Sequence, residues 1–140
     1  MFFKIIWNQS LLSFFRNGTM ISYQEDGEVI FENSLLSPGA ELVSWDSDIG
    51  YFDERSVLQL PLLRRGNKYR LKLNGEIFPE GSTLLKIEFF NRVSESVGYC
   101  FLDLDQETFE YPMEAYHYKI SILSTGLKRL SFREMILTEE

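Results

Sequence analysis

The chain has 140 residues, of which 44% are hydrophobic and 15% aromatic, and its net charge is −7. A hydrophobic share of this size supports a packed core, so the composition excludes a wholly disordered chain. The length fits one domain, which we place over residues 1–140. The negative charge argues against nucleic acid as a main partner, because phosphate binding requires clustered lysine and arginine.

Short apolar stretches separated by turn residues run through the first third of the chain, which predicts strands. These strands cover residues 2–7, 19–23, 28–32 and 40–46. Asp26-Gly27 is a turn signal and predicts a hairpin between the second and third of them. Residues 47–56 are polar and aromatic without a regular period, which predicts a long loop. Residues 58–63 are apolar around Pro61, so they form an edge strand or an irregular packed segment.

Clear two-residue periodicity begins after Gly66-Asn67. Apolar Tyr69, Leu71 and Leu73 alternate with basic side chains, which predicts a strand with one buried and one solvated face. Asn74-Gly75 closes this strand. Three further extended segments are predicted at residues 85–89, 97–102 and 108–111, and Met113-Glu114 forms one helical turn.

The strictest alternation lies near the C-terminus of the sequence. Tyr116, Tyr118, Ile120 and Ile122 form one row, and Leu130 with Phe132 form another after a turn at residues 124–126. Many short strands at regular spacing, with no helical apolar stripe, indicate an all-β fold. We therefore predict an antiparallel β-sandwich of the jelly-roll type.

Few residues are available for catalysis. The chain has one histidine, His117, and one cysteine, Cys100, and no serine lies in a nucleophile-elbow motif. We expect a buried thiol and an exposed imidazole, with no catalytic residue and no cofactor. A single cysteine also excludes an internal disulfide and fits a reducing compartment.

Acidic residues gather in two predicted loops. Asp46, Asp48, Asp53 and Glu54 belong to one loop, and Asp103 and Asp105 belong to the other. Calcium sites use such carboxylates, but the spacing does not match an EF-hand, and acidic loops are common at this net charge. We predict no metal site, and calcium binding and a glycosidase-like carboxylate pair stay as alternatives.

Aromatic residues outside the strand periods are the best candidates for contact with a partner. Trp45, Tyr51 and Phe52 flank or occupy the long acidic loop, and Arg55 lies beside them. Flat rings beside polar and charged groups are typical of protein interfaces and of sugar-binding surfaces. The alternative is that these rings cover the end of the core, above all for Trp45.

No membrane-spanning or export segment is predicted. Lys4 interrupts the first apolar run, no small-residue cleavage site follows, and no apolar run approaches 18 residues. These features predict a cytoplasmic location.

Three segments together resemble one known family. They are LQLPLLRRGNKYRL at residues 58–71, VIFENSLLSPG at residues 29–39 and LKIEFFNR at residues 85–92. With the tail at residues 111–136, they are similar to the third and smallest accessory Sec system protein of streptococci and staphylococci. The similarity covers most of the chain from about Gly18.

The resemblance implies a non-enzymatic adaptor for the export of serine-rich-repeat glycoprotein adhesins. Its implied partners are two sibling accessory secretory proteins, the accessory translocation ATPase and the glycoprotein itself, with peripheral association at the membrane. The implied fold is similar to carbohydrate-binding modules. Two other functions stay open: a stand-alone carbohydrate-binding module, and a sandwich enzyme such as an isomerase or esterase.

Overall fold

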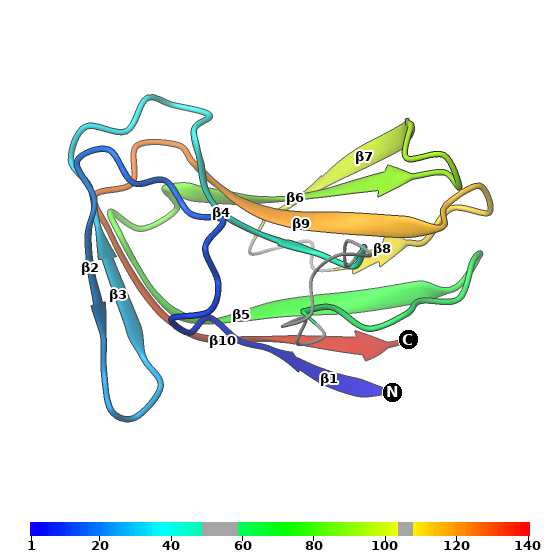
Figure 1. Ribbon diagram of the computed structural model, residues 1–140, viewed down its shortest axis with the longest axis horizontal. Coiled ribbons are helices and arrows are strands. Elements are labelled where there is room, and N and C mark those ends of the chain that lie inside the picture. Colours follow the sequence, from blue (N-terminus) through cyan, green and yellow to red (C-terminus); the bar gives the residue numbers. More distant parts are fainter. Residues whose placement is uncertain (49–58, 104–107) are drawn as a thin grey trace.

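Two antiparallel β-sheets face each other in the computed structural model, which describes residues 1–48, 59–103 and 108–140. Figure 1 shows their strands in two layers. No helix occurs among the described residues. The predicted antiparallel β-sandwich is confirmed.

Ten strands make up the described part of the two sheets. They are β1 (Phe2–Ile5), β2 (Met20–Tyr23), β3 (Val29–Glu32), β4 (Glu41–Asp46), β5 (Lys68–Phe78), β6 (Thr83–Phe90), β7 (Ser96–Leu102), β8 (Thr108–Glu110), β9 (His117–Ser124) and β10 (Arg129–Glu139). Sheet A has the order β2-β3-β10-β5-β8, and β1 also pairs with β10. Sheet B has the order β4-β9-β6-β7.

The long pair β5–β10 organises sheet A. A register shift between Phe132 and Glu134 marks a bulge in β10, and Gly75 of β5 lies opposite Phe132. A Cβ atom at Gly75 would lie 2.1 Å from the carbonyl oxygen of Ser131, so only glycine allows this close approach of the two backbones. The prediction that Asn74-Gly75 closes the strand is therefore wrong, and β5 continues to Phe78.

Two details of the segment before β9 also differ from the sequence predictions. Met113-Glu114 forms a turn, closed by a hydrogen bond from the Ala115 amide to the Pro112 carbonyl (3.1 Å), and not a helical turn. Tyr116 is 43% exposed, whereas Ala115 is buried. The strand alternation begins only at His117, because the turn sets the direction of the side chains before it.

One half of the core is a cluster of aromatic rings between the sheets. Trp45 of β4 stacks on Phe132 of β10 at a centroid distance of 5.5 Å. Trp7 meets Trp45, Phe132 and Phe31 of β3 at 6.3, 5.8 and 6.0 Å. Rings from both sheets therefore contact each other directly, and such pairs add to the stabilisation from burial alone.

A second aromatic cluster fills the other half. Phe89 of β6 contacts Phe109 and Tyr111 at centroid distances of 6.2 and 5.8 Å. Tyr118 of β9 is buried, and its hydroxyl donates a hydrogen bond to the Pro61 carbonyl at 2.7 Å. Burial raises the pKa of Tyr118, so the phenol keeps its proton for this bond.

The period-two prediction of the core holds at most positions. Leu73 and Leu85 are partly buried, and eight predicted core residues are fully buried: Tyr69, Leu71, Ile87, Phe89, Tyr118, Ile120, Leu130 and Phe132.

We expect Phe89→Ala to lower the free energy of unfolding by roughly 3–5 kcal/mol, because Phe89 is 4% exposed and the cavity left between the sheets cannot collapse fully. Lys72→Ala is the control, since this side chain is exposed on the outer face of β5, and it should change stability by less than about 0.5 kcal/mol. Urea denaturation curves of both variants measure the difference. A loss of less than about 1 kcal/mol for Phe89→Ala contradicts the assigned packing.

Candidate interaction surface

The four residues predicted to contact a partner have different outcomes. Trp45 is 1% exposed, and its Nε1 donates a hydrogen bond to the Ile6 carbonyl at 2.9 Å. Trp45 is therefore a core residue, which was the alternative left open for it, and its prediction as a partner contact is wrong. Tyr51, Phe52 and Arg55 lie outside the described residues.

The segment around Pro61 is packed against the sandwich without forming a strand. Leu60 is fully buried, the Pro61 carbonyl accepts the Tyr118 hydroxyl, and the Arg64 amide donates to the Tyr69 hydroxyl at 2.7 Å. The sequence left an edge strand or an irregular packed segment open for this region. Residues 59–63 form the irregular packed segment, and Pro61 does not mark a strand edge.

The two edge strands of sheet B have different surroundings. At β4, Phe14 forms a bridge with Val43, and the Ser44 amide donates to the Ser13 carbonyl at 2.9 Å, so the N-terminal segment covers this edge. At the opposite edge, β6 is the only described strand that pairs with β7. β7 thus presents one side of its backbone without a strand partner in the described part of the chain.

The composition of β7 is unusual for such an edge. Its seven residues, SVGYCFL, include no charged residue and no proline. Natural proteins protect exposed edges with charges, prolines or short strands, because an unprotected edge pairs with other chains. An apolar edge strand in a chain of net charge −7 is therefore a candidate docking surface.

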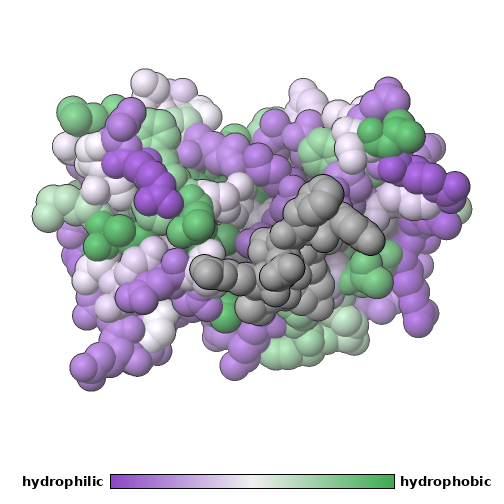
Figure 2. All heavy atoms as spheres, viewed as in Figure 1, coloured by the Kyte–Doolittle hydropathy of each residue, from purple (hydrophilic) through white to green (hydrophobic). Residues whose placement is uncertain are grey.

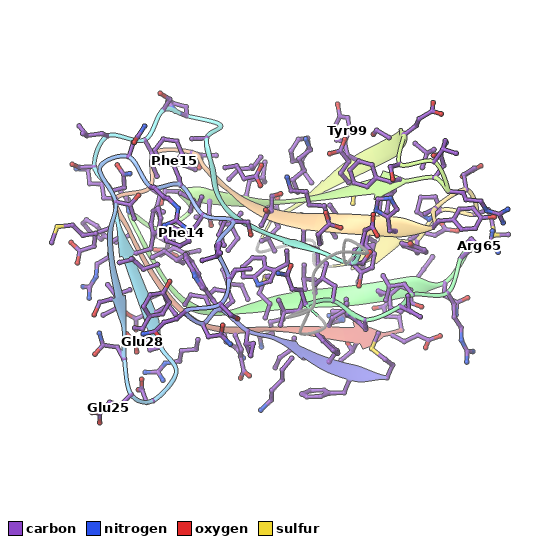
Figure 3. All side chains as sticks on the ribbon, in the orientation of Figure 1. Phe14, Phe15, Glu25, Glu28, Arg65 and Tyr99 are labelled. Atoms are coloured by element: carbon purple, nitrogen blue, oxygen red, sulfur yellow. The ribbon has the colours of Figure 1, made fainter. Side chains whose placement is uncertain are left out.

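Exposed apolar side chains lie in a row along β7. Val97, Tyr99 and Phe101 are 37%, 61% and 45% exposed. The rings of Tyr99 and Phe101 meet edge to face at 5.4 Å, and Lys86 Nζ lies 5.1 Å from the Tyr99 ring centroid. Tyr99 projects from β7 on the outer side of sheet B (Figure 3). We call Val97, Tyr99, Phe101 and Lys86 the β7 edge surface.

Other exposed hydrophobic residues are more scattered. On the face shown in Figure 2, hydrophobic residues occupy separate areas toward the two ends of the molecule. Exposed aliphatic residues such as Leu35 and Leu62 are common on soluble proteins. The β7 edge surface differs because it combines two adjacent aromatic rings with an unpaired strand.

Tyr116 is a second exposed aromatic residue, but its contacts lie within the chain. The guanidinium groups of Arg65 and Arg92 lie 4.7 and 4.8 Å from its ring centroid, and Arg92 Nη2 donates to its hydroxyl at 3.1 Å. This hydrogen bond and the two positive charges lower the pKa of Tyr116. The ring therefore already has cationic partners within the chain.

His117 does not form a catalytic triad with its neighbours. Its Nε2 lies 3.3 Å from Ser94 Oγ and 4.0 Å from Asp48 Oδ2, while its buried Nδ1 has no partner among the described residues. A triad requires the serine and the carboxylate on opposite nitrogens of the imidazole. The ring stacks on Phe90 at 4.9 Å and is half-buried, where the sequence predicted an exposed imidazole.

The described residues contain no group of three or more His, Cys, Asp or Glu side chains that could hold a metal ion. Asp53, Glu54 and Asp105 of the predicted acidic loops lie outside them. In the same described ranges, no helix is long and apolar enough to cross a membrane.

Comparison with known proteins identifies the family. The model of the accessory Sec secretory system protein 3 family matches residues 14–139. Accessory Sec system protein 3 of Streptococcus gordonii is 36% identical over 122 residues, which are 87% of this chain and 77% of the relative. The chain belongs to the accessory Sec system protein 3 family.

Other family members extend the comparison. The Staphylococcus aureus member is 32% identical over 98% of this chain, which spans 43% of the relative. In the crystal structure of accessory secretory proteins 1, 2 and 3 of Streptococcus pneumoniae, one chain matches with a TM-score of 0.90 and 33% identity, over 98% of this chain and 95% of that one. A chain of the Glycosylation Associate Protein (Gap123) complex of Streptococcus agalactiae matches with a TM-score of 0.85 and 34% identity, over 99% of this chain and 44% of that one.

In this family member, the one cysteine lies on the inner side of the β7 edge. Cys100 pairs with Ile87 of β6 and is partly buried, close to the buried thiol that the sequence predicted. Burial raises the pKa of its thiol to about 11. The nucleophilic form is the thiolate, so the environment of Cys100 opposes reactivity at neutral pH.

We expect folded protein to react with iodoacetamide far more slowly at neutral pH than protein unfolded in urea. The rate should rise as the pH approaches about 11, because deprotonation then becomes favourable in the folded state. Mass spectrometry of timed samples measures the rate. Equal rates for folded and unfolded protein at neutral pH would show that the thiol is not protected by burial.

Proposed function

We propose that this chain is a non-enzymatic adaptor of the accessory Sec export complex, which assembles with sibling accessory secretory proteins. One observation carries this conclusion: a member of the accessory Sec family exposes an uncharged, aromatic edge strand. Main-chain groups of such an edge can pair with a strand of another chain, and the alternate side chains select the partner.

Two solved relatives support assembly with siblings. The Streptococcus pneumoniae structure contains accessory secretory proteins 1, 2 and 3, and the Streptococcus agalactiae structure is the Gap123 complex. Both contain a chain that matches at least 98% of this one. In our proposal, the β7 edge surface is the contact through which this chain joins such a complex.

The aromatic pair is well suited to a central position in the interface. Tyrosine and phenylalanine are enriched in the buried centres of interfaces, and a few such residues supply most of the binding energy. Lys86 and Glu88 of β6 lie opposite Phe101 and Tyr99 and place charges beside the rings. These charges select among partners more than they add affinity.

We further propose that the assembled complex delivers serine-rich-repeat glycoprotein adhesins to the accessory translocation ATPase. The role in delivery, the cytoplasmic location and a peripheral position at the membrane follow from the family resemblance. The net charge of −7, with more acidic than basic side chains, is compatible with this role and this location.

The non-enzymatic role agrees with the geometry of the titratable groups. His117 lacks a partner for Nδ1 among the described residues, and the burial of Cys100 raises the pKa of its thiol. Neither residue has the nucleophile, base and orienting group that acyl or glycosyl transfer requires.

We expect Tyr99→Ala and Phe101→Ala each to weaken binding to a sibling accessory secretory protein by about 1–3 kcal/mol, because each removes an aromatic contact at the interface centre. The thermal midpoint should barely change, because both rings are exposed in the isolated chain. Isothermal titration calorimetry with the purified sibling and a melting curve measure the two effects.

Phe2→Ala is the matched control. Phe2 is 62% exposed, close to the 61% of Tyr99, and lies on an edge strand of sheet A. It should leave the affinity unchanged. An equal loss for Phe2→Ala and Tyr99→Ala, or no loss for either β7 variant, contradicts docking through β7.

The same titration tests the loop residues that the sequence singled out. Tyr51→Ala or Arg55→Ala should weaken binding by roughly 1–3 kcal/mol without lowering the thermal midpoint, if the loop contributes to the same interface. A lowered thermal midpoint in both variants would assign Tyr51 and Arg55 to the core instead.

A further inference from the structure

Three loops meet at one end of the sandwich, and each contributes one polar side chain to a common cluster. Arg65 precedes β5, Arg92 lies in the β6–β7 hairpin, and Tyr116 lies in the turn before β9. Figure 1 shows the β6–β7 hairpin at the end of the sandwich where β5 and β9 begin, and Figure 3 shows Arg65 at that end. We call Arg65, Arg92 and Tyr116 the arginine–tyrosine cluster.

Hydrogen bonds of the backbone hold the three loops together. The Gly66 amide donates to the Tyr111 carbonyl at 2.7 Å, and the Tyr116 amide donates to the Phe90 carbonyl at 2.8 Å. In the hairpin, the side-chain oxygen of Asn91 accepts two backbone amides, at 3.0 and 2.9 Å. The side chains of the cluster therefore start from fixed backbone positions, which lowers the entropy lost when a ligand binds.

Both arginines act on the same phenol. The guanidinium carbons of Arg65 and Arg92 lie 4.7 and 4.8 Å from the ring centroid of Tyr116. Arg92 Nη2 also donates a hydrogen bond to the Tyr116 hydroxyl at 3.1 Å. This hydrogen bond, followed by the effect of Arg65, lowers the pKa of Tyr116. Two positive charges thus lie around one hydroxyl group.

No carboxylate neutralises these two charges within the described residues. Arg65 and Arg92 form no ion pair there, although acidic residues outnumber basic ones by 21 to 14 in the whole chain. Arg129 and Arg133, by contrast, pair with acidic side chains of residues 26–32. Two like charges around one ring repel each other, and an anion bound between them would remove this repulsion.

The cluster offers donors and lacks an occupied acceptor for them. Each guanidinium has several N–H donors, and the Tyr116 hydroxyl accepts from Arg92 while its own proton stays available. Glu95 and Glu114 are exposed on the same loops, but neither pairs with an arginine in the described part of the chain. A cation is repelled by the cluster, and a neutral ligand leaves its charges uncompensated. The ligand is therefore an anion.

Charge and the number of oxygens distinguish the possible anions. A carboxylate brings one charge and two oxygens. A phosphate monoester brings a charge between about −1.5 and −2 at neutral pH and three terminal oxygens. Two guanidinium forks and one hydroxyl match three oxygens and a double charge, and arginine binds phosphate through two parallel hydrogen bonds.

We infer that the arginine–tyrosine cluster binds a phosphate monoester. Arg65 and Arg92 bind its oxygens, and the Tyr116 hydroxyl donates to one of them. Soluble phosphorylated compounds and the headgroup of phosphatidic acid both carry this group. The cluster lies on loops outside the β7 edge surface, and its ligand class does not depend on the proposed adaptor function.

Arginine side-chain signals give a direct test in the unaltered chain. In ¹⁵N–¹H correlation spectra at constant ionic strength, glycerol 3-phosphate should shift the Nε–H signals of Arg65 and Arg92 with saturation. The signal of Arg16 should stay in place. Acetate should bind at least about tenfold more weakly than glycerol 3-phosphate, because it brings one charge and two oxygens.

Variants locate the site and assign the signals. Arg65→Gln and Arg92→Gln should each weaken the binding of glycerol 3-phosphate about tenfold, and Tyr116→Phe should weaken it roughly threefold. Arg16→Gln is the matched control and should have no effect. Its guanidinium is also exposed and lies 4.4 Å from an aromatic centroid, that of Phe14, but without a second cation or a hydroxyl group.

Arg92→Lys separates a built site from diffuse charge. Lysine keeps the positive charge but cannot form two parallel hydrogen bonds, so this variant should also bind about tenfold more weakly. Melting curves of all variants should match that of the unaltered chain, because the exchanged side chains are exposed.

Vesicle flotation identifies the source of the phosphate. Flotation with phosphatidylcholine vesicles that contain phosphatidic acid, lost in Arg65→Gln, assigns the lipid headgroup. Saturable binding of glycerol 3-phosphate without flotation assigns a soluble compound. Either result supports the site.

Three results would overturn the inference. Glycerol 3-phosphate shifts neither Arg65 nor Arg92 up to its solubility limit; Arg65→Gln binds as tightly as Arg16→Gln; or Arg92→Lys keeps the full affinity of the unaltered chain.

Discussion

Contact between aromatic rings across the two sheets is the interaction on which this sandwich depends. Trp45 of sheet B stacks on Phe132 of sheet A, and Trp7 packs against both rings. Because Trp7 follows β1, the same contact fixes the start of the chain against the core. The hydrogen bond from Trp45 Nε1 to the Ile6 carbonyl then orients that segment. The contacts that bury the rings therefore also fix the path of the N-terminal segment.

The placement of the N-terminal segment determines which edge of sheet B is open. The segment continues from Trp7 to residues 13–15, which bond to β4 and cover that edge. β7, at the other side of the sheet, has no equivalent cover within the described residues. Strand addition requires an accessible edge, and among the described residues β7 is the edge of sheet B that meets this requirement. In the proposed adaptor function, this open edge is the one that receives a sibling accessory secretory protein.

The local pattern of side chains predicted most of the core but not the surfaces. Tyr69 and Leu71 alternate with lysine and arginine, and a strand with one wet face is the only arrangement that buries the first pair and solvates the second. For Trp45, the local pattern did not distinguish a core residue from an interface residue. An aromatic residue next to an acidic loop can lie either in the core or at an interface. Only the stacking of Trp45 on Phe132, which is distant in sequence, places it in the core.

The sequence by itself determined the fold class, the inward rows of the long strands, the hairpin at Asp26-Gly27 and the family, because these depend on neighbours along the chain. The tertiary structure alone decided which strand lies at an edge, since pairing joins segments that are far apart in sequence. From the sequence, Tyr99 and Phe101 belong to a predicted strand without charged residues. Only the strand order β4-β9-β6-β7 places that strand at the edge of sheet B. Likewise, the continuation of β5 through Gly75 depends on the close approach of Ser131, a contact that no local pattern contains.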